Sequence, residues 1–193
     1  VSNSAFGSSA MQDNVTGGQN SAFGTNALSS TVSGSDNVAF GYNALLSDTN
    51  GLRNTAIGTE AMRNHLTGAN NVAIGKEALS NNLEGSLNVA LGYQAGQNEL
   101  GSNKLYIDND NTTTPLIYGD FANDILEFNG SVGIGTTPTN AKFEVLGSGS
   151  SLDSTTYGYL NSSGNTGIWT NEPVYSIYSD GKIGGESFHA HSD

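Results

Sequence analysis

The chain has 193 residues, of which only 12% are charged, whereas about a quarter are charged in ordinary proteins. Its formal net charge is −12 with six lysine and arginine residues, which excludes the basic footprint that nucleic acid binding needs. No stretch approaches ~18 consecutive apolar residues and no charged-then-apolar leader opens the chain, so we expect a soluble segment. Because the chain has no cysteine, disulfide bonds are excluded.

The first half of the chain is an internal repeat with a constant step of 17 residues. Six blocks read Asn-x-Ala-(Phe/Ile/Leu)-Gly, and they begin at Asn3, Asn20, Asn37, Asn54, Asn71 and Asn88. Self-similarity at a short, fixed period is the signature of a solenoid, in which each repeat makes one coil. The six repeats cover more than half of the chain.

Each block alternates between two kinds of side chain, as a strand does. The larger positions are Ser4, Ser21, Val38, Thr55, Val72, Val89, Phe6, Phe23, Phe40, Ile57, Ile74 and Leu91. Asn and Ala alternate with them, which predicts a five-residue strand with one apolar face and one small, polar face. Stacked coils lie ~4.8 Å apart, and the Asn column is expected to bond to itself along the stack.

The rest of each repeat predicts a second short element and a glycine turn. The second element begins Ala-Leu or Ala-Met in five of the six copies, and another apolar column is formed by Val15, Val32, Thr49, Leu66, Leu83 and Leu100. The pattern leaves open whether this element is a strand or one helical turn. We expect His65, in the fourth coil, to lie on the surface.

One such coil is too thin to bury its own core. Its main interior candidates are Ala, Gly, Ser and Asn, and these small residues favour self-association. The blocks resemble the inner strands of trimeric autotransporter adhesin heads, which are left-handed parallel β-rolls. The resemblance implies a homotrimer, although the 17-residue step is longer than is usual in those heads. The alternative is an unrelated monomeric β-solenoid.

From Ser102 the repeat ends, and the sequence pattern predicts short strands separated by turns. The predicted strands are 104–107, 115–118, 125–128, 131–135 and 141–146, and Asn129-Gly130 is a strong hairpin signal. The run from Asp108 to Thr112 invites a calcium-loop interpretation, but it lacks the glycine and distal glutamate of an EF-hand and favours a solvated turn. We therefore predict an all-β chain: β-roll 1–101, β-rich connector 102–147 and tip 148–193.

Aromatic residues gather in the tip, after the flexible segment 147–151. They are Tyr157, Tyr159, Trp169, Tyr175 and Tyr178. Because flat rings stack on sugar faces, these residues are candidates for a glycan-binding surface. The alternative is that they form the core of a small β domain.

Two further segments resemble phage tail spikes and fibres that carry an intramolecular chaperone. Segment 131–138 followed by 142–145 resembles the region upstream of that chaperone, and the ending 187–193 resembles its start. The resemblance implies chaperone-guided trimerisation and autoproteolytic release, with Ser192 beside the scissile bond and Asp193 after it. The chaperone body is absent, so the sequence looks like the mature product, and any protease activity belongs to the missing part.

The chain ends with a His-x-His pair, His189 and His191. Alternate residues of an extended strand share a face, so three chains around an axis would offer an octahedral set of imidazoles to a transition metal. Iron sites of this type recur at the tips of phage spikes and fibres, and the resemblance implies one iron-like ion per trimer. The alternative is two exposed histidines.

No catalytic constellation is evident, since the only close Ser, His and Asp are adjacent in sequence and the carboxylates are scattered. We expect a non-enzymatic fibre of a phage tail or contractile injection particle, located on the virion or outside cells. Its expected partners are two further copies, other tail or baseplate proteins and a host receptor, expected to be a glycan, but no nucleic acid. Alternatives are a bacterial cell-surface trimeric adhesin and a polysaccharide-depolymerising tail spike.

Overall fold

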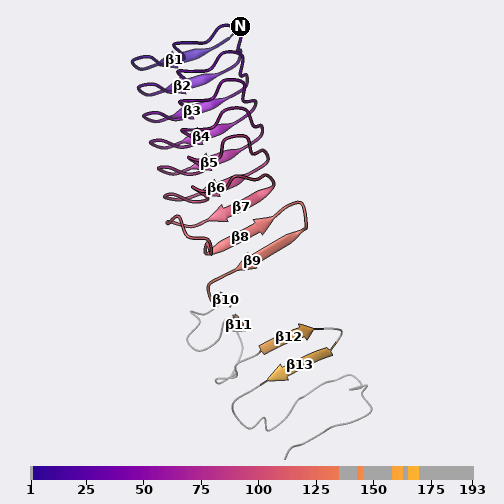
Figure 1. Cartoon of the computed structure of the whole chain (residues 1–193). Helices are drawn as coiled ribbons and strands as arrows, with labels where there is room; N and C mark the ends of the chain where they lie inside the picture. Colours follow the sequence, from indigo (N-terminus) through magenta and orange to yellow (C-terminus); the bar gives the residue numbers. More distant parts are fainter. Residues whose placement is uncertain (1, 135–142, 146–157, 163–164, 170–193) are drawn as a thin grey trace, which may run out of the picture. The chain divides into compact units, whose positions relative to one another are not determined.

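The structure is a computed structural model that describes residues 2–134, 143–145, 158–162 and 165–169. Within these residues every regular element is a strand, which confirms the all-β prediction. The strands are β1 Ser4–Phe6, β2 Ser21–Phe23, β3 Val38–Phe40, β4 Thr55–Ile57, β5 Val72–Ile74, β6 Val89–Leu91, β7 Lys104–Ile107, β8 Ile117–Asp120, β9 Ile125–Phe128, β10 Val132–Ile134, β11 Phe143–Val145, β12 Gly158–Ser162 and β13 Asn165–Trp169 (Figure 1). The chain divides into two compact units, Val1–Gly130 and Ser131–Asp193.

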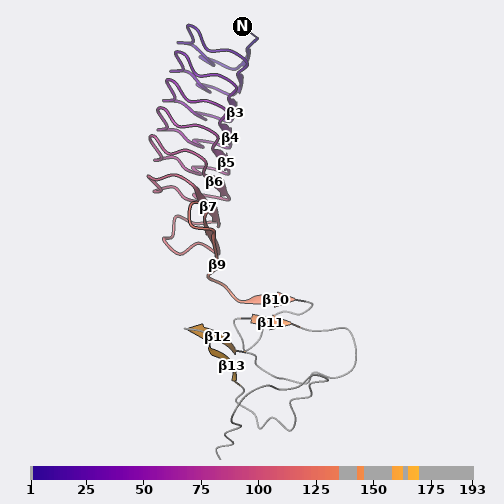
Figure 2. The same ribbon diagram turned by 90° about the vertical axis from the view of Figure 1, so that its right-hand side faces the viewer.

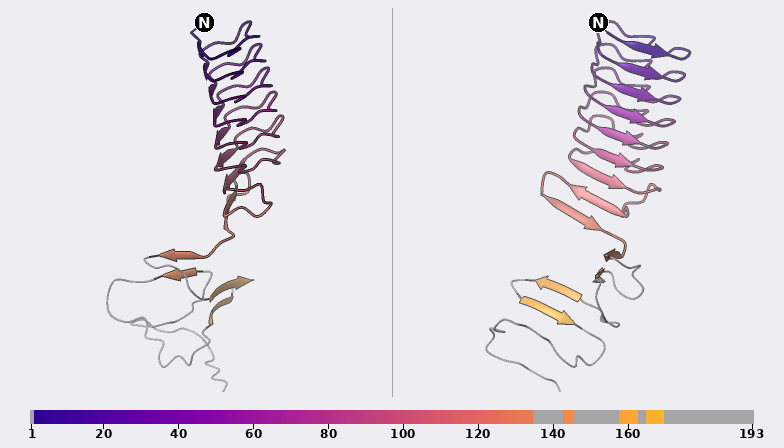
Figure 3. Two further views of the ribbon diagram at one scale, coloured as in Figure 1. Left: turned by 90° about the vertical axis from the view of Figure 1, so that its left-hand side faces the viewer. Right: turned by 180° about the vertical axis from the view of Figure 1, so that it is seen from behind.

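The first unit is a parallel β-solenoid of six coils. Strands β1 to β6 pair in parallel, and each residue pairs with its equivalent 17 positions later, as Ala22 does with Ala39. Strand β7 continues the stack, but Val89 pairs with Leu105, so this last step is one residue shorter. Strands β8 and β9 then extend the same sheet in antiparallel fashion, as the view from behind shows (Figure 3).

The strands have three residues instead of the predicted five, and backbone conformation explains the difference. The glycine that follows each strand has a positive φ, for example +136° at Gly58. The residue before each Asn of coils two to six is also left-handed, for example Arg53 with φ 57°. Extended backbone is therefore confined between two positive-φ positions in coils two to six.

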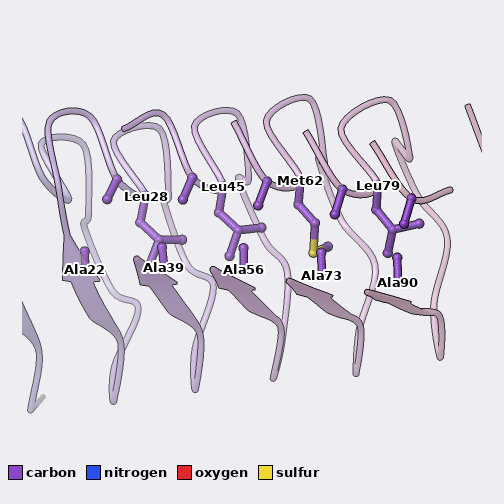
Figure 4. Close-up of a cluster of buried hydrophobic side chains, with 14 of the residues drawn as sticks. Ala22, Leu28, Ala39, Leu45, Ala56, Met62, Ala73, Leu79 and Ala90 are labelled. Atoms are coloured by element: carbon purple, nitrogen blue, oxygen red, sulfur yellow. The ribbon is translucent and has the colours of Figure 1, made fainter. Parts of the chain in front are cut away.

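The core of the solenoid is a double row of side chains. Alanines of the sheet, such as Ala39 and Ala56, point inward toward Leu28, Leu45, Met62 and Leu79 from the opposite side of the coil (Figure 4). All of these side chains are fully buried. Ala and Asn were correctly predicted to lie inside, whereas the Leu and Met positions were missing from the interior candidates.

The second element of each coil is neither a strand nor a helical turn. It is a series of tight turns in which alternate residues are left-handed, such as Asn26 with φ 58° and Leu28 with φ 52°. Its backbone groups bond to the neighbouring coils, since Leu28 N donates to Ala44 O at 3.0 Å while Asn26 N donates to Ser8 O at 2.9 Å. Figure 2 shows this turn layer on one side of the coils and the strands on the other.

The buried asparagines form the expected ladder, but mainly through the backbone. The side-chain oxygen of Asn37 accepts from the backbone N–H of Asn54 at 2.9 Å, and its side-chain nitrogen donates to Gly51 O at 2.8 Å. The same two bonds recur in the other coils, for example at Asn20. Each asparagine thus joins its coil to the next and satisfies a carbonyl of the turn glycine.

The sheet ends at β9, and the predicted hairpin at Asn129-Gly130 does not form. Among the described strands β9 pairs only with β8, and Asn129 instead bonds to the residues just before β8, with its N–H on Leu116 O and its side chain on Pro115 O. In the second unit, β10 pairs in parallel with β11, and β12 and β13 form an antiparallel hairpin.

Candidate functional sites: an apolar sheet face and a polar column

The outward face of the nine-stranded sheet is the most unusual surface of the first unit. Directly paired residues share a face, so the alternation seen in β1 to β6 continues through β7, β8 and β9. We call the following outward positions the sheet face: Ser4, Phe6, Ser21, Phe23, Val38, Phe40, Thr55, Ile57, Val72, Ile74, Val89, Leu91, Leu105, Ile107, Ile117, Gly119, Leu126 and Phe128. None of them is charged.

The sheet face is apolar and exposed in the single chain. The relative exposure of Phe6 is 74%, of Phe40 56% and of Phe128 51%. Near the N-terminal end the aromatic rings of Phe6, Phe23 and Phe40 lie over one another, with centroids 6.2 and 5.8 Å apart. Contiguous apolar surface of this extent marks an interaction site in proteins that work in water.

The second notable feature is a polar column inside the solenoid, three residues before the turn glycines. Asp48 Oδ1 accepts from Gly51 N at 2.6 Å, and His65 Nε2 accepts from Gly68 N at 3.2 Å. His65 is fully buried, so the prediction that it lies on the surface is wrong: its ring lies inside the coil, where it accepts from the turn N–H of Gly68. His65 Nδ1 lies 3.9 Å from Asp48 Oδ2.

This column also holds every buried side-chain atom that lacks a protein hydrogen-bond partner in the described residues. The atoms belong to Asn14, Thr31, Asp48, His65 and Asn82. The acceptors of Asp48 and His65 are each used by a turn N–H, which leaves their second polar atoms facing the interior. Turn closure therefore accounts for Asp48 and His65, whereas the buried oxygens of Thr31 and Asn82 have no hydrogen-bond partner in the described residues.

The sites predicted for the tip fall largely outside the described residues. Tyr157, Tyr175, Tyr178, His189, His191, Ser192 and Asp193 all lie there. Tyr159 stands in β12 opposite Ile168, and Trp169 stands in β13 opposite Gly158, so backbone pairing does not place these two aromatics directly across from each other. In the part of the chain that the structure describes, no three His, Cys, Asp or Glu residues group together.

The predicted turn at Asp108–Asn111 joins β7 to β8. Asp108 Oδ1 accepts from Asn109 N at 2.7 Å and its Oδ2 accepts from Leu116 N at 3.2 Å, while Asp110 accepts from Asn111 N. These carboxylates close the backbone of the turn. The neighbouring end of the solenoid was not predicted from the sequence to be a functional site, although the break in the repeat at Gly96 marks its position.

Comparison of the chain with protein-family models, with curated proteins and with solved structures found no match. Among the residues that the structure describes, no helix is long and apolar enough to cross a membrane.

Proposed function

We propose that this chain is the shaft and tip segment of a homotrimeric fibre that attaches a particle to a cell surface. The observation that carries the proposal is the sheet face. Its eighteen positions on nine strands include no charged side chain, although the chain as a whole carries a net charge of −12. Because charged side chains are excluded from the sheet face and lie elsewhere on the chain, the sheet face is suited to be the interface between copies of this chain.

Geometry favours association along the whole length of the sheet. Nine strands at the usual spacing give a face roughly 38 Å long, which is sufficient for an extended interface. Three copies around a common axis would bury all three faces against one another. The polar and acidic side chains of the turn layer would remain in water and keep the fibre apart from its neighbours.

The particle that carries the fibre is proposed from the sequence resemblance. Segments 131–138 and 187–193 support a phage tail or a related contractile injection particle, with maturation by chaperone autocleavage at Ser192 and Asp193. Adhesion by three identical tips would give weak individual sites a higher combined affinity. The repeat itself supports the alternative, a bacterial trimeric adhesin. A basic chaperone domain directly after Asp193 in the full-length gene favours the fibre, and a membrane anchor favours the adhesin.

The oligomeric state tests the proposal. We expect light scattering of the 193-residue chain to give a mass near three times 19.9 kDa. Phe40→Asp should dissociate the assembly, because it places a charge within the apolar sheet face, on β3. Tyr42→Asp is the matched control, since Tyr42 is almost as exposed as Phe40 (51% against 56%) but lies beyond the strand and outside the sheet face. A folded wild-type monomer, or equal dissociation by both variants, would contradict the proposal.

A further inference from the structure

The repeat breaks at the end of the solenoid, where a cavity opens. In the sixth coil Gly96 replaces the buried Leu or Met of the earlier coils, and Tyr106 of β7 occupies the place where β1 to β6 carry Ala. The two changes fit together, because a Cβ atom on Gly96 would come within 2.9 Å of the Tyr106 ring. Beside this ring lies a cavity of about 140 Å³, which we call the end cavity.

One wall of the end cavity is an amide held at both ends. The side-chain nitrogen of Gln97 donates to Glu77 at 2.9 Å, and its oxygen accepts from Asn111 at 3.2 Å. Glu77 is itself fixed by Gln94 at 2.6 Å and by Lys76 at 2.9 Å, and these hydrogen bonds lower its pKa. A carboxylate from the preceding coil and the loop after β7 thus orient Gln97 before any ligand arrives.

The floor of the end cavity is an aromatic ring with a fixed hydroxyl. Tyr106 donates to Glu99 Oε2 at 2.5 Å, and the other oxygen of Glu99 accepts from Gly101 N. Burial and the bond to Glu99 raise the pKa of Tyr106, so the phenol stays neutral. Asn98 and Thr112 add an amide and a hydroxyl to the rim.

We propose that the end cavity binds one neutral sugar unit. Amides, hydroxyls and a carboxylate match the alternating donors and acceptors of a sugar ring, while the Tyr106 ring offers a flat apolar surface. The volume equals that of roughly five water molecules, which is the scale of a single ring and far below drug-sized sites. Glu99 and the carboxylates of the adjoining loop, Asp108 and Asp110, disfavour acidic sugars and phosphates.

The end cavity is separate from the sheet face. Tyr106 alternates along β7 with Leu105 and Ile107, so the cavity and the sheet face lie on opposite sides of that strand. The inference extends the proposed adhesion but does not depend on trimer formation, so sugar binding and oligomeric state can fail independently.

Titration of the full chain with methyl glycosides of glucose, galactose, mannose and N-acetylglucosamine, followed by amide NMR shifts, tests the inference. At least one neutral glycoside should shift the amides of residues 96–99 and 111–113. Gln97→Ala should weaken that binding about tenfold, whereas Gln12→Ala, at the same position of the first coil, should leave it unchanged. Methyl glucuronide should bind at least tenfold more weakly than methyl glucoside.

Three results would overturn the inference. One is the absence of shifts at these amides with all four neutral glycosides while the chain remains folded. The second is equal weakening by Gln97→Ala and Gln12→Ala, which would place binding elsewhere. The third is tighter binding of the glucuronide than of the glucoside, which would reject a neutral sugar as the ligand.

Discussion

At the scale of single residues, His65 shows what a coil position demands. The equivalent residues Asn14, Thr31, Asp48 and Asn82 differ in size and charge, but all can accept a hydrogen bond. His65 meets this demand with Nε2, which faces Gly68 N at 3.2 Å and the side-chain nitrogen of Asn71 at 3.4 Å. Asp48 and His65 use their acceptors to close the turn, whereas the buried oxygens of Thr31 and Asn82 have no hydrogen-bond partner in the described residues. The column therefore shares polar character and not a particular side chain.

Two substitutions of His65 should separate these roles. His65→Asn restores the residue found at the same position of coils one and five, so we expect only a small loss in the free energy of unfolding. His65→Leu removes the acceptor and leaves the part-buried Gly68 N–H unpaired, which should cost about 1–3 kcal/mol. Urea unfolding measures both values, and equal losses in the two variants would show that the hydrogen bond is unimportant.

At the scale of elements, the last strands close the solenoid through ionic and aromatic contacts on its inner side. Lys104 of β7 donates to Asp120 of β8 at 2.7 Å, and the rings of Tyr106 and Tyr118 meet edge to face at 5.5 Å. Asp120 also accepts from Asn123 and Ala122, which fixes the turn into β9. In these last strands, polar contacts stabilise the inner side of the sheet in place of the apolar double row found in the coils.

The Lys104 bond makes this closure sensitive to acid. Hydrogen bonds from Lys104 and Asn123 lower the pKa of Asp120 to about 2, below the ordinary aspartate value near ~3.9. The folded state therefore favours the carboxylate, and this stabilisation is complete above the ordinary pKa and disappears as the pH falls toward 2. The thermal midpoint should drop across this range in the wild type.

The matching variant is Asp120→Asn, which has no carboxylate to titrate. Its thermal midpoint should be lower than that of the wild type at pH 5 and should fall less steeply between pH 4 and 2, as followed by circular dichroism. Identical slopes in the two proteins would show that other carboxylates dominate the acid response.

Sequence reasoning predicted the coils because their signal is periodic. The step of 17 residues follows from the spacing of the repeats, and the division into one apolar face and one face of Ala and Asn follows from strand alternation. The turn layer could not be predicted, since Leu28 and Met62 adopt left-handed conformations that residues with bulky side chains ordinarily avoid. Nor could the end cavity, because Gly96 and Tyr106 compensate each other only in space.

At the scale of the whole molecule, the proposed trimer would bring the His-x-His pair of three chains together. We propose that His189 and His191 hold one iron-like ion per trimer, on the basis of the sequence alone. Metal analysis of the purified trimer should then give about one ion per three chains. The double variant His189→Ala, His191→Ala should lose the ion and keep the trimeric mass, because the sheet face is unchanged.

A result in which the double variant retains the metal would place the ion elsewhere. If the wild-type trimer contains no metal even when iron is supplied during expression, the metal site is rejected and the proposed fibre is unaffected. His65 is the one histidine of the chain outside this pair, and its burial in the core makes it a poor competitor for the ion.

The uniform coils have a consequence for how such a chain can change its length. Each coil occupies the same 17 positions and presents the same backbone groups to the coils on either side. Unequal recombination between two copies of the repeat would therefore delete or add whole coils without creating a mismatched junction. Each coil gained or lost would change the length of the solenoid by about 4.8 Å. Related genes could therefore encode solenoids of different length between the same two ends.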